Sequence, residues 1–523
     1  MVKSSLNKIF ILQLVLFSLI ITGILPRETS VFLAIGLIIY FILAPIEDAT
    51  VFFVRSIPFF IAIPITADYD NLNVWRILAI VLFLKWFFRE SIVHYVLFIR
   101  DWFKNCNLKQ PSYLLAGLLL IALLSVIPAQ DKISGITRII FFINFSLAGI
   151  VIYNLAKDNP EFTKRLIKNI AVPTIIVTVV GFIQIASTYF IDIYQFMRIW
   201  GEGIQLRQFG TLWSEIAVRL GNTWFAYYGS QLSLRVFSLF PDSHSFPQFV
   251  LLGLPALFAL SFSTLLVNVQ NVEWRILIRR RAKMRVLWVV ATMLITILSG
   301  TRGIWAASVG VLIIMAGVIY WMHRTRVGSY YKNIFKYVSL YMTVFFLLFA
   351  VAYPIFVSPQ FLLSKGDWSL FSERIKSIVD FGETSNSQRI EIWKASLESI
   401  KQRPLLGVGI GNFPVVLDQR IFLARAGSSA HNIYLNITAE MGILALVLTL
   451  WFLWLVFRKC YENFISGDDP FLTLYFGATL IFVPWVLIYS LTDVALFDER
   501  SFLLFVTVVT IILANKNPIE SGS

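Results

Sequence analysis

Charged residues are scarce in this sequence. They make up only 14% of its 523 residues, whereas 58% are hydrophobic, and an average soluble domain carries about 25% charged residues. A soluble core could not hide so much apolar surface, but a lipid bilayer can take the place of that core. The composition therefore predicts a polytopic membrane protein.

Cysteine is also scarce. The two cysteines, Cys106 and Cys460, form no CxxC motif, which argues against a disulfide framework and against a cysteine zinc site, and we expect free thiols. The first residues, MVKSSLNK, precede an apolar run without a small-residue cleavage site. They predict a first transmembrane helix and not a signal peptide.

Positive charge is concentrated between the apolar segments. The net charge is +14, and the basic residues cluster at 100–109, 157–165, 279–285 and 324–336. If the spans alternate, these stretches lie on one side, which by the positive-inside rule is the cytoplasm. We therefore expect both termini in the cytoplasm and membrane lipid around the protein. No basic patch falls outside this pattern, so we expect no nucleic-acid partner.

Apolar segments long enough to span a bilayer recur along the chain. They lie near 9–25, 31–46, 52–65, 75–94, 112–128, 133–153, 167–190, 246–268, 286–299, 303–321, 337–358, 432–457, 471–490 and 500–514. The prediction is an all-α polytopic protein with about 12–14 transmembrane helices. Segment 52–65 contains Arg55 and two prolines, which predicts a broken or re-entrant helix packed against protein.

These spans divide the chain into regions. We predict N-terminal transmembrane helices (1–190), a first long outer loop (191–245), central transmembrane helices (246–358), a large outer loop (359–431), C-terminal transmembrane helices (432–514) and a disordered cytoplasmic tail (515–523). In the large outer loop, Ile390, Trp393, Leu397 and Ile400 have helical spacing and would share one face. The large loop is therefore predicted to be a small helical domain on the membrane surface.

The outer segment SGTRGIWAASVG joins two apolar spans through a polar turn. Arg302 lies at the membrane surface, and Gly300 and Gly303 allow a sharp turn before the next helix. Backbone donors at a helix N-terminus together with an arginine suit a phosphate. Alternatively, Arg302 extends to lipid headgroups.

A second outer segment, SQRIEIWKASLESIKQRPLLGVGIGNF, places Arg389 and Trp393 one helical turn apart. Arg389 is a candidate anion ligand or part of a surface salt bridge, and Trp393 suits stacking on a sugar ring or packing. The glycines of GVGIGNF resemble part of a dinucleotide fingerprint, but no strand precedes them and no βαβ unit surrounds them. A flexible or tightly turned loop is the better interpretation.

The third outer segment, AHNIYLNITAEMGILALVL, contains His431 where the large loop returns to the membrane. Histidine is the natural general base near neutral pH; the alternative is a residue that merely starts a helix. Glu440 lies further along, inside the predicted membrane boundary, where a carboxylate needs a partner.

A fourth outer segment, RVFSLFPDSHSFPQF, contains Arg235, Asp242 and His244 just before a span. His244 is a second candidate base. The alternative is a solvated loop in which Asp242 and Ser243 start the next helix.

Taken in order, SGTRG, QR…W…PLLGVGIGNF and HN.YL…AE.G resemble the signature region of O-antigen ligases and related polysaccharide polymerases. The resemblance covers about residues 230–460, and PLLGVGIGNF…HNIYLNITAEMGILAL is its most specific part. One departure is Gln388, where a small residue such as Ser often precedes the arginine.

The resemblance implies a metal-independent, inverting glycosyltransferase without a cofactor, in the bacterial inner membrane, with its active site facing the periplasm. Arg302 and Arg389 would hold the pyrophosphate of an undecaprenyl-linked glycan donor, with Arg235 as a further ligand. His431, followed in the motif by Asn432, would take the proton of the acceptor hydroxyl. Arginines suit a leaving group whose charge grows in the transition state, and the sequence places no acidic cluster to hold a metal.

Three acceptors remain open at this point. A ligase would transfer the glycan to lipid A–core, a polymerase to a second lipid-linked repeat, and a third enzyme to a protein hydroxyl. A transporter is the alternative of another class; the sequence argues against it, because few charges lie in mid-span and no inverted repeat is present.

Overall fold

A computed structural model of the chain describes residues 2–66, 70, 72–89, 110–211, 223–228, 231–266, 272–363, 384–418 and 428–515. Two predicted features lie outside these residues: the basic cluster at 100–109, which includes Cys106, and the predicted tail apart from residue 515. Cys460 is a free, buried thiol.

The first part of the chain is mostly helical. Its elements are α1 (Val2–Ile21), α2 (Thr29–Leu43), α3 (Ile46–Arg55), η1 (Ile57–Phe59), β1 (Ala62–Ile63), β2 (Leu72–Asn73), α4 (Val74–Arg89), α6 (Pro111–Ser125), α7 (Lys132–Ala156), α8 (Pro160–Ser187), α9 (Ile193–Phe196), the π-helix η2 (Met197–Gln205), α10 (Leu206–Phe209), β3 (Phe225–Tyr228) and β4 (Gln231–Leu234). The strands form two antiparallel hairpins, β1–β2 and β3–β4, which the sequence analysis did not predict.

The second part supplies the remaining helices. They are α12 (Ser245–Leu266), α13 (Val272–Leu298), α14 (Arg302–Arg324), α15 (Ser329–Phe356), α17 (Thr384–Gln402), η5 (Phe413–Leu417), α18 (Ile433–Met441), α19 (Ile443–Ser466), α20 (Pro470–Tyr489), η7 (Ala495–Phe497) and α21 (Glu499–Ala514).

Among the described residues, seven helices are long and apolar enough to cross a membrane: α7, α8, α12, α14, α15, α19 and α20. Shorter apolar helices lie in α1, α2, α6 and α13. The predicted class, an all-α polytopic membrane protein, is confirmed. The domain boundaries and the orientation in the membrane stay predictions.

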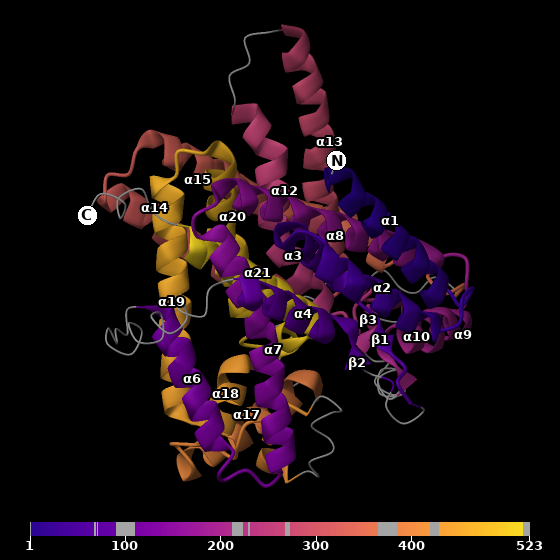
Figure 1. Cartoon of the computed structure of the whole chain (residues 1–523), viewed down its shortest axis with the longest axis vertical. Helices are drawn as coiled ribbons and strands as arrows, with labels where there is room; N and C mark the ends of the chain where they lie inside the picture. Colours follow the sequence, from indigo (N-terminus) through magenta and orange to yellow (C-terminus); the bar gives the residue numbers. More distant parts are fainter. Residues whose placement is uncertain are drawn as a thin grey trace.

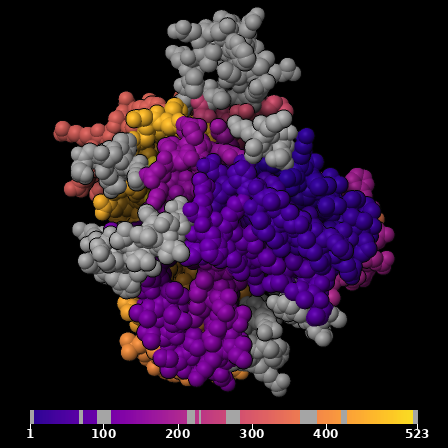
Figure 2. All heavy atoms as spheres, viewed as in Figure 1, coloured from indigo at the N-terminus to yellow at the C-terminus, as the bar shows by residue number. Residues whose placement is uncertain are grey.

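The core lies around α12 and α20. In each of them 89% of the membrane-spanning window is buried inside the protein, whereas α15 and α19 bury only 22% of theirs. Helices α6 and α7 run side by side to the end of the molecule where α17 and α18 lie, whereas α1 begins toward the opposite end (Figure 1). The N-terminal helices, in indigo, cover much of the face seen in Figure 2.

Three sequence interpretations need correction. The basic residues at 279–285 do not form a loop, because α13 begins at Val272 and runs through them. The single span predicted over 432–457 is two helices, α18 and α19, separated by Gly442 at φ +88°. In α17, Leu397 is 50% exposed while Ile400 is buried, and the buried face includes Ile392 instead.

Segment 52–65 is broken, as its prolines suggested. Helix α3 ends at Arg55, and η1 and β1 follow. The Arg55 guanidinium donates to the side-chain oxygens of Asn169 and Asn7, each at 2.7 Å. The charge is therefore held by amides of neighbouring segments.

Candidate active site

Several helix ends meet at one place in the fold. The hydroxyl of Thr301, directly before α14, donates to the carbonyl of Ser243, just before α12, at 2.7 Å. The hydroxyl of Ser501, in the first turn of α21, donates to the Ser245 carbonyl at 3.0 Å. The N-termini of α12, α14 and α21 therefore lie together, and helix N-termini attract negative charge.

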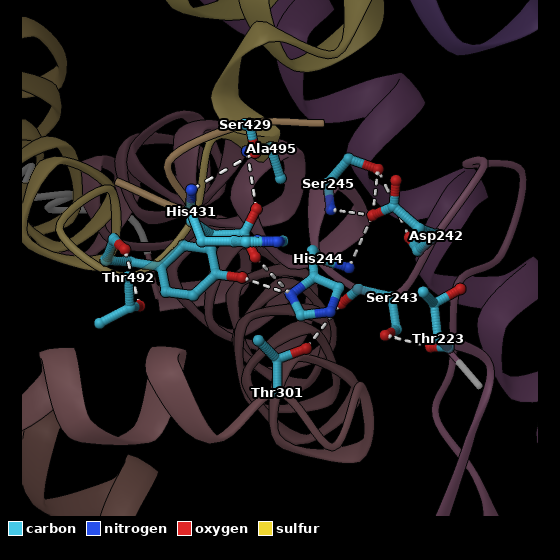
Figure 3. Close-up of polar contacts among 12 residues, drawn as sticks. Thr223, Asp242, Ser243, His244, Ser245, Thr301, Ser429, His431, Thr492 and Ala495 are labelled. Atoms are coloured by element: carbon cyan, nitrogen blue, oxygen red, sulfur yellow. Dashed lines mark hydrogen bonds and ion pairs between the residues drawn. The ribbon is translucent and has the colours of Figure 1, made fainter. Parts of the chain in front are cut away.

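His244 lies at the centre of this junction (Figure 3). Its Nδ1 is 2.8 Å from the Tyr489 hydroxyl and 3.0 Å from Asp493 Oδ2, and its Nε2 is 3.2 Å from an Arg235 nitrogen. A guanidinium can only donate, so the contact requires a lone pair on Nε2. The His244 proton therefore resides on Nδ1 and faces Asp493 and Tyr489.

Asp242 explains why α12 begins beside this ring. Its carboxylate accepts the backbone N–H groups of His244 at 2.8 Å and of Ser245 at 2.7 Å, as an N-cap residue does. The Ser243 hydroxyl donates to the Thr223 carbonyl at 2.7 Å. Asp242 and Ser243 thus start the helix, and the His244 side chain is left to face Tyr489.

Arg235 directly follows β4, so the β3–β4 hairpin sets its position. Its backbone N–H donates to the Trp224 carbonyl at 2.8 Å. Its guanidinium lies 3.3 Å from the Thr301 hydroxyl as well as beside His244. Arg235 thereby joins the hairpin to the starts of α12 and α14.

Arg302 is the first residue of α14. The preceding Thr301 makes no side-chain hydrogen bond to the first turn of this helix, because its hydroxyl donates to Ser243 instead. Gly300 has φ +62°, and a Cβ added at Gly303 would lie 2.6 Å from Tyr489. Both glycines are therefore required by the turn and by the close approach of α14 to α20.

His431 is held from several sides. It precedes Asn432, whose side chain accepts the backbone N–H groups of Tyr434 and Leu435 in the first turn of α18. The neighbouring Ala430 is clamped at both ends: its carbonyl accepts the Trp393 indole N–H at 2.9 Å, and its N–H donates to Asn436 at 3.1 Å. Trp393 on α17 therefore fixes the backbone next to the candidate base.

The backbone of His431 is strained. Its φ is +45°, in the left-handed region that is costly for a residue with a side chain and that often marks functional sites. Within the described residues, its Nδ1 is buried without a hydrogen-bond partner. Burial lowers the pKa of His431; Asp493 opposes this shift, and Arg389 acts in the same direction as burial. The ring is therefore neutral, as a base must be.

Asp493 supplies the negative charge of the site. Burial alone would raise its pKa, but the charge and hydrogen bond of His244 and the charges of His431 and Arg389 outweigh burial, and the pKa lies well below its usual value. Asp493 is thus ionised at neutral pH, and it places Arg389 and both histidines within one electrostatic neighbourhood.

Glu440 lies in a different setting. It is buried, and it accepts the backbone N–H of Phe413 at 3.2 Å, after the glycine loop whose residues 407, 409 and 411 all have positive φ. A Cβ added at Gly409 would lie 2.5 Å from Ala129 in the α6–α7 turn. The loop is a tight packing element that Glu440 ties to α18.

The structure adds two residues that the sequence analysis did not select, Tyr489 and Asp493. Tyr489 lies at the end of the second-last predicted span, and Asp493 lies in the short outer loop after it. That loop contains further acidic residues. That charge on the predicted outer side was the available signal. Within the described stretches of the chain, no three His, Cys, Asp or Glu side chains group as metal ligands would.

The fold and the site together define a class of protein. It is a polytopic membrane protein whose helix N-termini, arginines and histidines converge on one buried carboxylate.

Comparison with known proteins gives the family. Residues 286–450 match the family described as O-antigen ligase, so the chain carries a domain of that family and the resemblance seen in the sequence is confirmed. No curated protein matches the chain. The matched region includes Arg302, Arg389, Trp393, His431, Asn432 and Glu440. Arg235, His244, Tyr489 and Asp493 lie outside it, and only the fold brings them to this domain.

The family sets the general activity. Its members are O-antigen ligases or polymerases, so the matched domain implies a glycan-transferring enzyme within a multi-pass membrane protein.

Proposed function

We propose that the protein transfers a glycan from undecaprenyl pyrophosphate to a hydroxyl of lipid A–core on the periplasmic side of the inner membrane. One observation carries this proposal: the charge network around Asp493, which links the predicted base His431 to Arg389 and, through His244, to Arg235.

The donor pyrophosphate is assigned to Arg302 and Arg389. Arg302 begins α14, whose first turn receives no side-chain cap from Thr301, and uncapped backbone donors with an arginine suit phosphate oxygens. Arg389 adds charge beside His431. This arrangement supports binding of the two phosphates between α14 and α17.

His431 is assigned as the general base. It takes the proton of the acceptor hydroxyl through Nε2, since Nδ1 is the buried nitrogen. The acceptor oxygen attacks the anomeric carbon as the bond from that carbon to the pyrophosphate oxygen breaks. The electron pair stays on the pyrophosphate, where the arginines stabilise the growing charge, and attack from the opposite face inverts the configuration. Asp493 stabilises the imidazolium that forms.

His244 and Arg235 are assigned positioning roles. The Nε2 of His244 is directed at Arg235 and so is not available as a base in this arrangement. Its proton on Nδ1 keeps Asp493 and Tyr489 in place. His244 therefore orients Arg235 toward the starts of α12 and α14, where it adds a third positive charge near the leaving group.

The test is a gel of surface polysaccharide from a deletion strain complemented with wild type or with His431→Ala. We expect wild type to restore a long ladder on lipid A–core, and His431→Ala to leave long chains on the undecaprenyl carrier. His323→Ala is the matched control, because His323 is exposed at the far end of α14; it should complement fully.

Arg302→Ala and Arg389→Ala should fail in the same assay while the proteins still insert, and Arg324→Ala, at an exposed position, should not. Chains shortened to a single repeat on the core would identify a polymerase instead. An unchanged ladder in the deletion strain would reject both lipid-linked acceptors and reopen the transporter class.

A further inference from the structure

Helix α19 has too short an uncharged stretch to cross a bilayer by itself. It begins at Ile443, and Arg458 is its first charged residue, which leaves 15 uncharged residues over 443–457. At the α-helical rise this stretch measures about 22 Å, whereas the hydrocarbon core is about 30 Å thick. Trp451 and Trp454, which are 48% and 58% exposed, mark the end near Arg458 as the one that meets the headgroups. The missing length therefore lies beyond Ile443, at the other end of the helix.

The chain beyond Ile443 is the turn that follows α17. We call Pro404, Leu405 and Leu406 the PLL tip. The Ile443 N–H donates to the Pro404 carbonyl at 2.8 Å, and a Cβ added at Gly442 would collide with the Leu405 carbonyl. The PLL tip is therefore fixed against the first turn of α19, at the depth where the helix runs out.

The PLL tip presents apolar surface outward. Leu405 is 77% exposed, and Ile443 and Leu444 at the start of α19 are 47% and 54% exposed. These side chains continue an exposed face of α19 that includes Val447, which is 50% exposed. Because α19 is long and apolar enough to span a membrane, the lipid that covers this face would extend to Leu405.

Helix α6 indicates the same level. It has 15 residues, Pro111–Ser125, and at about 22 Å it is also shorter than the hydrocarbon core. The hydroxyl of Ser125 accepts the Ile410 N–H at 3.2 Å, so α6 ends on the same glycine loop that follows the PLL tip. Ile127, just after α6, is 68% exposed. Two helices therefore end at this loop before the full apolar thickness is reached.

Basic side chains precede the PLL tip. Lys401 and Arg403 are exposed at the end of α17. Long basic side chains next to apolar residues at a membrane surface extend to the lipid headgroups. The order of basic and then apolar residues suits a segment that enters the bilayer from the headgroup side.

We propose that the PLL tip inserts into the outer leaflet of the bilayer and anchors the outer helical segment there. The N–H groups of Val408 and Gly409 donate to the carbonyls of Ala439 and Glu440, each at 2.9 Å, so the tip and α18 move as one. His431 precedes α18, which is 9 residues long, or about 13 Å. The anchored tip thereby holds His431 near the headgroup level, and this membrane contact does not depend on the reaction that the site performs.

The first test is photolabelling of the full-length wild-type protein in vesicles of phosphatidylethanolamine and phosphatidylglycerol. The probe is a phosphatidylcholine with a diazirine in the upper half of one acyl chain, and mass spectrometry locates the label. We expect label in 404–406 as well as in 443–447, and none in 390–398 of α17. Label in 443–447 without label in 404–406 would overturn the proposal.

A second test uses single cysteines labelled with an environment-sensitive fluorophore, in a background that carries Cys106→Ser and Cys460→Ala. The fluorophore at Leu405→Cys should be quenched by a nitroxide on the lipid acyl chain and not by aqueous iodide. Val447→Cys, on the exposed face of α19, is the matched lipid control, and Lys394→Cys, exposed on α17, is the matched water control. Quenching at Leu405→Cys by iodide would overturn the proposal. Quenching by neither agent would also overturn it, because a second copy or another protein would then cover the tip.

Discussion

Trp393→Phe isolates one hydrogen bond next to the candidate base. The substitution keeps an aromatic ring and removes the indole N–H that donates to the Ala430 carbonyl at 2.9 Å. Ala430 is fully buried, so its carbonyl would lose a partner that water cannot replace. His431, whose φ of +45° is costly, would then relax toward negative φ and carry its ring away from Asp493.

The size of the effect follows from that bond. A lost hydrogen bond costs about 1 kcal/mol, and a buried carbonyl left unsatisfied costs about 1–3 kcal/mol. If about 1–2 kcal/mol of this cost adds to the activation free energy of glycan transfer, kcat falls roughly 5- to 30-fold, since about 1.4 kcal/mol is a factor of ten. KM for the lipid donor should stay nearly constant, because the arginines are untouched.

The assay is steady-state glycan transfer by purified protein in vesicles. Trp454→Phe is the matched control, because Trp454 is 58% exposed on α19, and it should keep the wild-type kcat. Thermal melting of each variant separates a positioning effect from unfolding. A Trp393→Phe enzyme with the kcat of Trp454→Phe would refute the argument that this clamp positions His431, as would a loss confined to KM.

Three further predictions concern charge, packing and the start of α14. Burial places the pKa of His431 below its ordinary value. The kcat/KM of wild type should therefore stay constant to below about pH 6.5 and fall only as the pH drops through that pKa. Asp493→Asn removes the negative charge that raises this pKa, so the acidic limb of the profile should move to still lower pH, and the plateau value of kcat/KM should drop about 10- to 100-fold. A pH–rate profile checks this, and a limb that moves to higher pH contradicts it. Gly409→Ala, at φ +99° and 2.5 Å from Ala129, should destabilise the protein by about 1–3 kcal/mol in a thermal-shift assay, whereas Gly36→Ala, with no atom within 4 Å, should be neutral or slightly stabilising. Thr301→Val removes the hydroxyl shared with Ser243 and Arg235 and should raise KM for the donor roughly tenfold; equal KM values for Thr301→Val and the control Thr325→Val, at an exposed position, would show that this hydroxyl does not matter.

Much of the fold could be predicted from the sequence because its signals are local. Long apolar runs predict spanning helices wherever they occur, and the motif SGTRG predicted the turn at Gly300. The split at Gly442 was not, because an apolar run continues through it. Only the packing of that glycine against the Leu405 carbonyl shows why the chain must turn there.

The candidate site was predictable only in part. Arg302, Arg389 and His431 each stand in a short motif within the family domain. Tyr489 and Asp493 meet His244 across 245 and 249 positions of sequence, and no periodicity reports such a contact. A tyrosine at the end of an apolar helix also resembles an ordinary interfacial aromatic, so its position beside His244 became evident only from the packing of α20 against α12.

Product analysis with the purified enzyme in vesicles tests most directly whether His431 acts as the base for attack at the anomeric carbon. We expect wild type to convert a labelled polyprenyl-pyrophosphate glycan and lipid A–core into glycosylated core and free polyprenyl pyrophosphate in equal amounts, and His431→Ala to form neither. Release of polyprenyl phosphate instead would mean that a phosphorus–oxygen bond breaks. That result, or full turnover by His431→Ala, would contradict attack at the anomeric carbon with His431 as the base.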